Sequence, residues 1–108
     1  MNAMFGSATA FNQNISAWDT SAVTDMSYMF QVATLFNQNI SSWNTGAVTN
    51  MYGMFSSATA FNQNIGAWDV DLVTDFGNML DGSGLSSANY DNLLIGWEAQ
   101  SLQSGRTL

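Results

Sequence analysis

The side chains that could do chemistry in this chain are carboxylates, amides and hydroxyls. The 108 residues include eight acidic side chains, one basic side chain, Arg106, and no His or Cys. An imidazole base, a thiolate nucleophile, a conventional zinc site and a disulfide framework are therefore excluded. Paired carboxylates hydrolyse glycosides when one of them has a raised pKa in a cleft, but no pair stands out here. We expect a protein that is not an enzyme and binds no cofactor.

The acidic side chains also bear on metal binding and on partners. Ca²⁺ needs about six to eight convergent oxygens, but Asp19 and Asp25 recur as Asn44 and Asn50, so no carboxylate pattern is maintained and we expect no metal site. A net charge of −7 opposes binding to nucleic acid or anionic lipid. No apolar run approaches the ~20 residues of a membrane span. We therefore expect no nucleic-acid partner and no membrane insertion.

The amides form the most regular chemical pattern. The segment FNQNI occurs at 11–15, 36–40 and 61–65, a period of 25 residues that is typical of stacked repeat units. If each copy is a strand whose Ile faces inward, alternation turns Gln13, Gln38 and Gln63 inward and the neighbouring Asn side chains outward. The predicted outward face consists of Asn12, Asn14, Asn37, Asn39, Asn62 and Asn64. Such a face could bind glycan, extended peptide or ice, or its amides could hydrogen-bond one another.

Apolar residues recur with the same period and form the predicted core. Exposed tryptophans could instead stack on sugar rings, and exposed Met and Phe could form an adaptable binding face. Because these residues repeat in phase with Val and Ile, we expect packing. The predicted core columns are Phe11, Phe36 and Phe61; Ile15, Ile40 and Ile65; Trp18, Trp43 and Trp68; Val23, Val48 and Val73; Met26, Met51 and Phe76; Met29, Met54 and Met79; and Phe30, Phe55 and Leu80.

Two short elements in each repeat would position these columns. Val23, Met26, Met29 and Phe30 lie on one stripe of a short helix predicted over 24–30. Residues 12–16 are predicted to form a short strand that pairs in parallel with its equivalents at about 4.8 Å. Each unit would therefore contain one strand and one helix, as in an α/β repeat solenoid.

The end of the chain departs from the repeat. Residues 81–87 resemble a loop, and the spacing of Tyr90, Leu93, Leu94 and Trp97 predicts a helix over about 88–103. We therefore divide the chain into a repeat region, 1–80, which starts partway through a unit, and a C-terminal capping segment, 81–108. The whole would comprise about three to four 25-residue units plus a helical cap.

The residues of one repeat carry a family resemblance. The pattern V-T-D-M-x-x-M-F-x-x-A-x-x-F-N-Q-N-I-x-x-W over 23–43 resembles the bacterial surface protein 26-residue repeats, which occur in Listeria and Mycoplasma lipoproteins. That family is regarded as related to BspA-type leucine-rich repeats, so the resemblance implies a right-handed, leucine-rich-repeat-like coil of short parallel strands and short helices. Two departures are the 25-residue unit and the replacement of most Leu by Met, Phe and Trp. The family supplies no catalytic residues.

These observations together lead to a functional expectation. We expect a non-catalytic repeat module, extracellular or at the cell surface, that recognises protein or glycan through the strand face. A structural spacer or self-assembling stalk is the alternative, and ice binding is a minor one. The uncapped N-terminal end would expose apolar surface and promote self-association.

Overall fold

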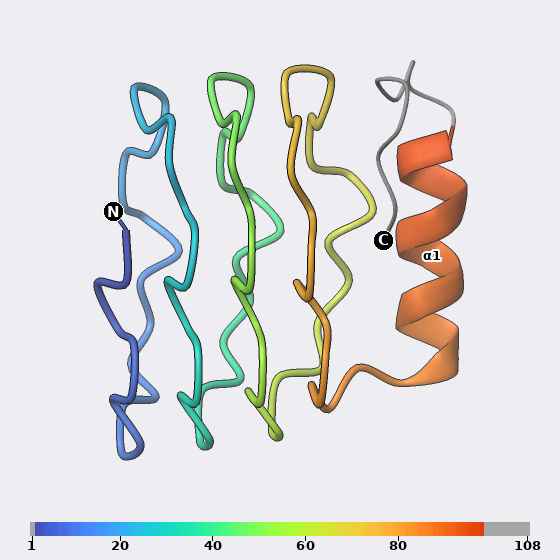
Figure 1. Ribbon diagram of the computed structural model, residues 1–108. Coiled ribbons are helices and arrows are strands. Elements are labelled where there is room, and N and C mark those ends of the chain that lie inside the picture. Colours follow the sequence, from blue (N-terminus) through green and yellow to red (C-terminus); the bar gives the residue numbers. More distant parts are fainter. Residues whose placement is uncertain (1, 99–108) are drawn as a thin grey trace.

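Residues one repeat apart lie above one another in the computed structural model, which describes residues 2–98 (Figure 1). The ring centroids of Phe30 and Phe55 are 5.5 Å apart with 4° between the ring planes, and those of Trp43 and Trp68 are 6.5 Å apart with 6° between the planes. Such aromatic pairs add about 0.5–1.5 kcal/mol each beyond their burial. The chain therefore forms units that lie side by side, followed by the helix α1 (Ser87–Glu98).

Backbone hydrogen bonds join the units through equivalent stretches that we call the turn segments (2–7, 25–32, 50–57 and 75–82). Alternate N–H groups donate to carbonyls of the next unit: Tyr28 to Tyr52 at 2.8 Å, and Phe30 to Met54 at 2.9 Å. The intervening N–H groups donate three residues back, as Gln31 does to Tyr28 at 3.2 Å. Because both sets of N–H groups have acceptors, the segment satisfies its backbone without forming a helix or a sheet.

Left-handed backbone conformations accompany this alternation. Each turn segment contains residues whose φ is positive, between 52° and 71°. One column of such residues is Ala3, Tyr28, Gly53 and Asn78, and the other is Ser7, Val32, Ser57 and Gly82. A positive φ is uncommon outside glycine, above all for a β-branched residue such as Val32. A right-handed helix cannot include these residues, so the helix predicted over 24–30 is wrong.

The segments that carry the amides (11–16, 36–41 and 61–66, the Asn segments) also lack regular structure. The N–H of Asn37 donates to Oδ1 of Asn12, and the N–H of Asn62 donates to Oδ1 of Asn37, each at 2.9 Å. A side-chain oxygen thus takes the place of the backbone carbonyl that a parallel sheet would use. The strand predicted over 12–16 therefore does not form.

The predicted α/β repeat solenoid is wrong, and so is the leucine-rich-repeat-like coil of parallel strands and helices. Within residues 2–98, regular structure is limited to α1 and to isolated parallel bridges between Asp25 and Asn50 and between Asn50 and Asp75. These bridges do not extend into a sheet. The molecule is a small compact globule with a radius of gyration of 12.5 Å and extents of 36 × 30 × 22 Å.

The core consists of side chains that point to the centre of each unit. The buried members of the predicted columns are Ile15, Met26, Met29, Phe30, Phe36, Ile40, Trp43, Val48, Met51, Met54, Phe55, Phe61, Ile65, Trp68, Val73, Phe76 and Met79. Phe11, Val23 and Leu80 are half-buried against this cluster. Trp18 is 37% exposed, so its predicted place in the core is wrong. Its neighbour on the outer side would belong to another unit, and no such unit is present among the described residues.

Two tyrosines lie over glycines of the following unit. A Cβ atom on Gly53 would be 3.0 Å from the ring of Tyr28, and a Cβ atom on Gly77 would be 2.7 Å from the ring of Tyr52. The two tyrosine rings meet edge to face, with their centroids 5.4 Å apart. The glycines therefore leave the space that the rings occupy.

Helix α1 begins after Ser86, whose Oγ accepts the N–H of Asn89 at 3.2 Å and thereby caps the first turn. Its buried face consists of Leu93 and Trp97, while Ile95 is exposed on the outside. The sequence predicted a helix over about 88–103, and the structure has one over Ser87–Glu98. Positions 99–103 of that prediction lie outside the described residues.

The segment around α1 supplies the last unit with donors that match those of a repeat. Nε1 of Trp97 donates to the carbonyl of Ile65 at 3.1 Å, as Nε1 of Trp68 does to the carbonyl of Ile40 at 3.0 Å. In the same way, the N–H of Ser86 donates to Oδ1 of Asn62 at 2.8 Å, and Nδ2 of Asn89 donates to that oxygen at 3.0 Å. The segment around α1 therefore makes, with the edge of the last unit, the hydrogen bonds that a following repeat would make.

Close backbone approach lets α1 dock on this edge. A Cβ atom on Gly96 would overlap the carbonyl oxygen of Gly66, and a Cβ atom on Gly66 would overlap the carbonyl oxygen of Asn92. Earlier repeats have Ser16 and Ser41 at the position of Gly66. The loss of a side chain at this one repeat position therefore marks the unit that the helix covers.

We expect Ser57→Gly to stabilise the protein. The left-handed conformation costs a non-glycine residue about 1–2 kcal/mol, and glycine adds about 0.5–1 kcal/mol of unfolded-state entropy. The net gain of about 0.5–1 kcal/mol is measured as a rise in the free energy of unfolding in urea. Ser56→Gly is the matched control, because Ser56 has no positive φ, and it should destabilise. Equal effects of the two substitutions would contradict the role of left-handed geometry.

We expect Gly96→Ala to weaken the docking of α1. The added methyl group would meet the backbone of Gly66, and overpacking of this kind costs about 1–3 kcal/mol. Gly46→Ala is the control, because its nearest contacts would be at 3.2 Å and 3.4 Å to side-chain oxygens. Urea unfolding followed by far-ultraviolet circular dichroism measures both variants. A Gly96→Ala protein as stable as the Gly46→Ala protein would contradict the close approach.

Candidate functional site

The outer column of amides in the Asn segments serves mainly to join the units. Oδ1 of Asn12 accepts the N–H of Asn37 at 2.9 Å and also Nε2 of Gln38 at 2.9 Å. The next unit repeats both contacts, with Nε2 of Gln63 donating to Oδ1 of Asn37 at 2.9 Å. Gln38 and Gln63 are half-buried on the surface and Gln13 is exposed, so the predicted inward orientation of these glutamines is wrong. The glutamines lie on the outside because Asn12 and Asn37 are their partners.

A second column, Asn14, Asn39 and Asn64, shapes a turn within each unit. Oδ1 of Asn39 accepts the N–H of Ser41 at 3.0 Å and its hydroxyl at 2.6 Å. Oδ1 of Asn14 and of Asn64 accepts the N–H two residues later in the same way, at 2.9 Å. All three side chains are exposed, and their Nδ2 groups have no hydrogen-bond partner in the described part of the chain. This column therefore offers free amide donors to a ligand.

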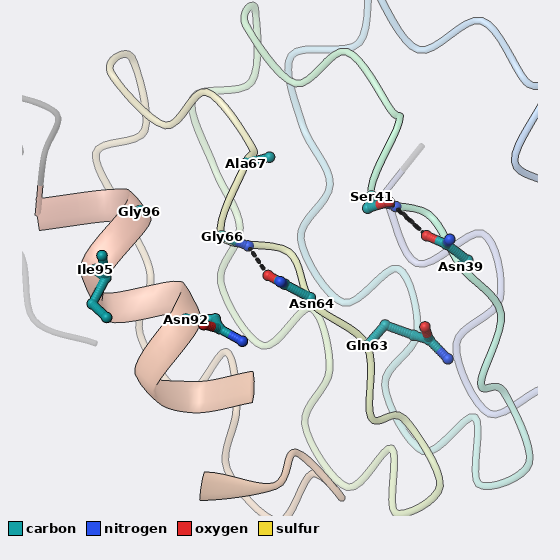
Figure 2. A pocket seen from close by; sticks show the side chains of 9 residues that line it. All are labelled: Asn39, Ser41, Gln63, Asn64, Gly66, Ala67, Asn92, Ile95 and Gly96. Carbon is teal, nitrogen blue, oxygen red and sulfur yellow. Dashed lines mark hydrogen bonds between the residues drawn. The ribbon is translucent and has the colours of Figure 1, made fainter. Parts of the chain in front are cut away.

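These side chains line two shallow hollows that are equivalent positions of successive repeats. The first, of about 330 Å³, is lined by Asn14, Ser16, Gln38, Asn39, Ser41 and Ser42. The second, of about 520 Å³, is lined by the residues exactly one repeat later, Asn39, Ser41, Gln63, Asn64, Gly66 and Ala67, together with Asn92, Ile95 and Gly96 of α1 (Figure 2). Asn39 lies between the two hollows and lines both. The surface therefore presents the same three amide positions twice, with three serines at the first hollow and Ser41 alone at the second.

Helix α1 forms a wall of the second hollow. Figure 2 shows Asn92 on the side of α1 that faces Asn64, with Ile95 one turn further along the helix. Ile95 is 71% exposed, which makes it an apolar contact beside polar amides. Asn92 and Ile95 were not predicted as site residues, because the repeat pattern does not place the helix against the Asn segments. The available signal was the pair Gly66 and Gly96, which marks where the two backbones meet.

The carboxylates of Asp19 and Asp25 accept hydrogen bonds within turns of the repeats. The hydroxyl of Ser27 donates to Oδ1 of Asp25 at 2.6 Å and holds the pKa of that carboxyl below its ordinary value. The hydroxyl of Ser21 has the same effect on the pKa of Asp19. An amide oxygen can take the same role, as Oδ1 of Asn44 does by accepting the N–H of Gly46. This shared geometry explains why Asp and Asn alternate at these positions.

The described residues contain neither a candidate metal centre nor a helix that could span a membrane. No group of three or more His, Cys, Asp and Glu in 2–98 is placed to hold a metal ion. In the same range, no helix has the length and apolar character that crossing a bilayer requires. The polar groups that line the two hollows are neutral amides and hydroxyls, and Ile95 adds an apolar contact to the second.

The comparisons with known proteins identify a family for this chain. No curated protein and no solved structure matches it. A family described as "Mycoplasma protein of unknown function, DUF285" matches residues 1–100, which include both hollows and the whole of α1. This chain belongs to that family.

Proposed function

We propose that this protein is a non-catalytic recognition module, extracellular or at the cell surface, that binds a neutral glycan along the two hollows. The observation that carries the proposal is the recurrence of the same three uncharged amide side chains at successive repeats. The resemblance of residues 23–43 to bacterial surface protein repeats supports the location.

The chemistry of the hollows favours hydroxyl-rich ligands. Each free Nδ2 group of Asn14, Asn39 and Asn64 can donate to a hydroxyl or carbonyl oxygen. The hydroxyl of Ser16 can donate or accept, and that of Ser41, which already donates to Asn39, can accept. No cationic side chain lines either hollow, so an acidic ligand would gain no charge pairing there. Each contact contributes only about 0.5–1.5 kcal/mol net. Two equivalent hollows on one rigid surface raise the affinity for a chain-like ligand that occupies both.

A structural spacer is the second candidate function. It is favoured by Asn12, Asn37 and Asn62, whose Oδ1 atoms accept hydrogen bonds from the next unit or from the segment around α1. Threonine hydroxyls also bond to neighbouring units. Oγ1 of Thr49 donates to the carbonyl of Thr24 at 3.2 Å, and Oγ1 of Thr74 donates to the carbonyl of Thr49 at 3.1 Å. Because these hydroxyls are committed to neighbouring units, we do not propose ice binding.

We expect Asn39→Asp to lower the affinity for neutral glycans at least about tenfold, since the substitution removes an amide donor from both hollows at once. A carboxylate oxygen can still accept the N–H of Ser41, as Asp69 accepts that of Asp71, so the turn is retained. An array of neutral oligosaccharides, followed by titration calorimetry on the best ligand, measures the affinity, and thermal unfolding checks the fold.

Asn44→Asp is the matched control for this experiment. It makes the same chemical change in a turn of the same kind, at a residue that lines neither hollow. Its affinity should equal that of the unmodified protein. Arrays that stay blank, or equal losses of affinity in both variants, would contradict glycan binding at the hollows and leave the spacer as the better function.

A further inference from the structure

The edge of the first unit has the same hydrogen-bond donors and acceptors that join the later units, but there they have no partner among the described residues. We propose that this edge binds one 25-residue unit with the same repeat pattern, presented by a separate polypeptide. The edge is formed by the turn segment 2–7 and the Asn segment 11–16 together with Trp18. The proposal does not depend on glycan binding: Asn14 and Ser16 of this segment line the first hollow, but the groups argued from here, Asn12, Gln13 and Trp18, line neither hollow.

The backbone of this edge presents acceptors at the required positions. The carbonyls of Ser27, Met29 and Gln31 accept N–H groups of the preceding unit at 2.9, 2.9 and 2.7 Å. One repeat earlier, the equivalent carbonyls are those of Asn2, Met4 and Gly6, which accept no hydrogen bond from the described residues. Their spacing along the edge is therefore that of a row of N–H groups from another turn segment.

The Asn segment presents the complementary donors. The N–H of Asn37 and Nε2 of Gln38 donate to Asn12 of the preceding unit. One repeat earlier, the N–H of Asn12 and Nε2 of Gln13 have no acceptor among residues 2–98. A partner must therefore supply an amide oxygen at the position that Asn12 occupies for its own neighbour.

Trp18 is the clearest unsatisfied group on the edge. Nε1 of Trp43 donates to the carbonyl of Ile15 at 3.0 Å and the ring is only 4% exposed. Trp18 is 37% exposed, and its Nε1 donates to no residue that the structure describes. The ring of Trp18 lies 5.6 Å from that of Phe5, which stacks on Phe11 at 4.1 Å, so the edge also presents an apolar patch. This combination fits a repeat unit, which buries the apolar patch and pairs each polar group.

The partner that fits this edge is a repeat unit and not a helix like α1. Helix α1 covers the opposite side of the repeats, where Gly96 approaches the backbone of Gly66. The edge of the first unit requires a row of N–H donors for the carbonyls of Asn2, Met4 and Gly6, which accept no hydrogen bond from the described residues. An α-helix has free backbone N–H groups only in its first turn, whereas the turn segment of a repeat directs alternate N–H groups to the neighbouring unit.

A synthetic peptide of residues 25–49 tests the proposal. It carries Tyr28→Ala, because the tyrosine ring would meet the Cβ atom of Ala3, and Trp43→Phe, so that all tryptophan fluorescence comes from the protein. We expect saturable binding with a blue shift of the emission as Trp18 becomes buried. Amide exchange should show new protection at Asn12 and none at α1. The Trp18→Phe protein should bind at least about fivefold more weakly, because one buried hydrogen bond is lost.

Two further samples keep the result decisive if the free peptide binds weakly because of its ordering entropy. In one, residues 26–50 with the same two substitutions are joined in front of residue 1, which keeps the 25-residue register and should bury Trp18 and raise the free energy of unfolding. In the other, a scrambled peptide of the same composition should not bind. A joined segment that leaves Trp18 exposed, equal binding by the scrambled peptide, or protection at α1 would overturn the proposal.

Discussion

The structure depends on one constraint: alternate N–H groups of each turn segment must reach carbonyls of the next unit, 24 residues later. This requirement fixes the repeat length, because an insertion of one residue would exchange the N–H groups that point to the next unit with those that point back. It also requires residues such as Tyr28 and Val32 to adopt left-handed backbone geometry. The stacked aromatic rings then follow from the register, since equivalent side chains are carried to equivalent places.

Much of the packing could be predicted from periodicity, but the local structure could not. The recurrence of Met26, Phe30 and Trp43 identifies side chains that share a core, whatever backbone carries them. The same spacing also suits a short helix, and periodicity alone does not exclude it. The left-handed residues that prevent the helix are mostly not glycine, so nothing in residue type marked Tyr28 or Val32. The strand failed for another reason: Oδ1 of Asn12 replaces a backbone carbonyl as the acceptor.

The candidate site was partly visible in the sequence. The regular amides could be identified, but their division into two roles depended on geometry: Asn12 bonds to the next unit, and Asn14 bonds within its own turn. The contribution of Asn92 and Ile95 depended on where α1 docks, which the sequence records only in Gly66 and Gly96. A surface whose acceptors are largely occupied and whose amide N–H groups are free is consequently more selective than a simple array of asparagines.

The tyrosines that lie over glycines have a consequence for how the repeats can be ordered. Successive units are so similar that a chain could in principle pair with the wrong neighbour during folding, or exchange units by recombination. Tyr28 requires a small residue at position 53, and Tyr52 requires one at position 77. If the units paired in a different order, a tyrosine ring would meet a side chain in place of a glycine. Each of these two tyrosine–glycine contacts therefore fits only one pair of neighbouring units. The contacts favour a single order of units whose sequences are otherwise nearly identical.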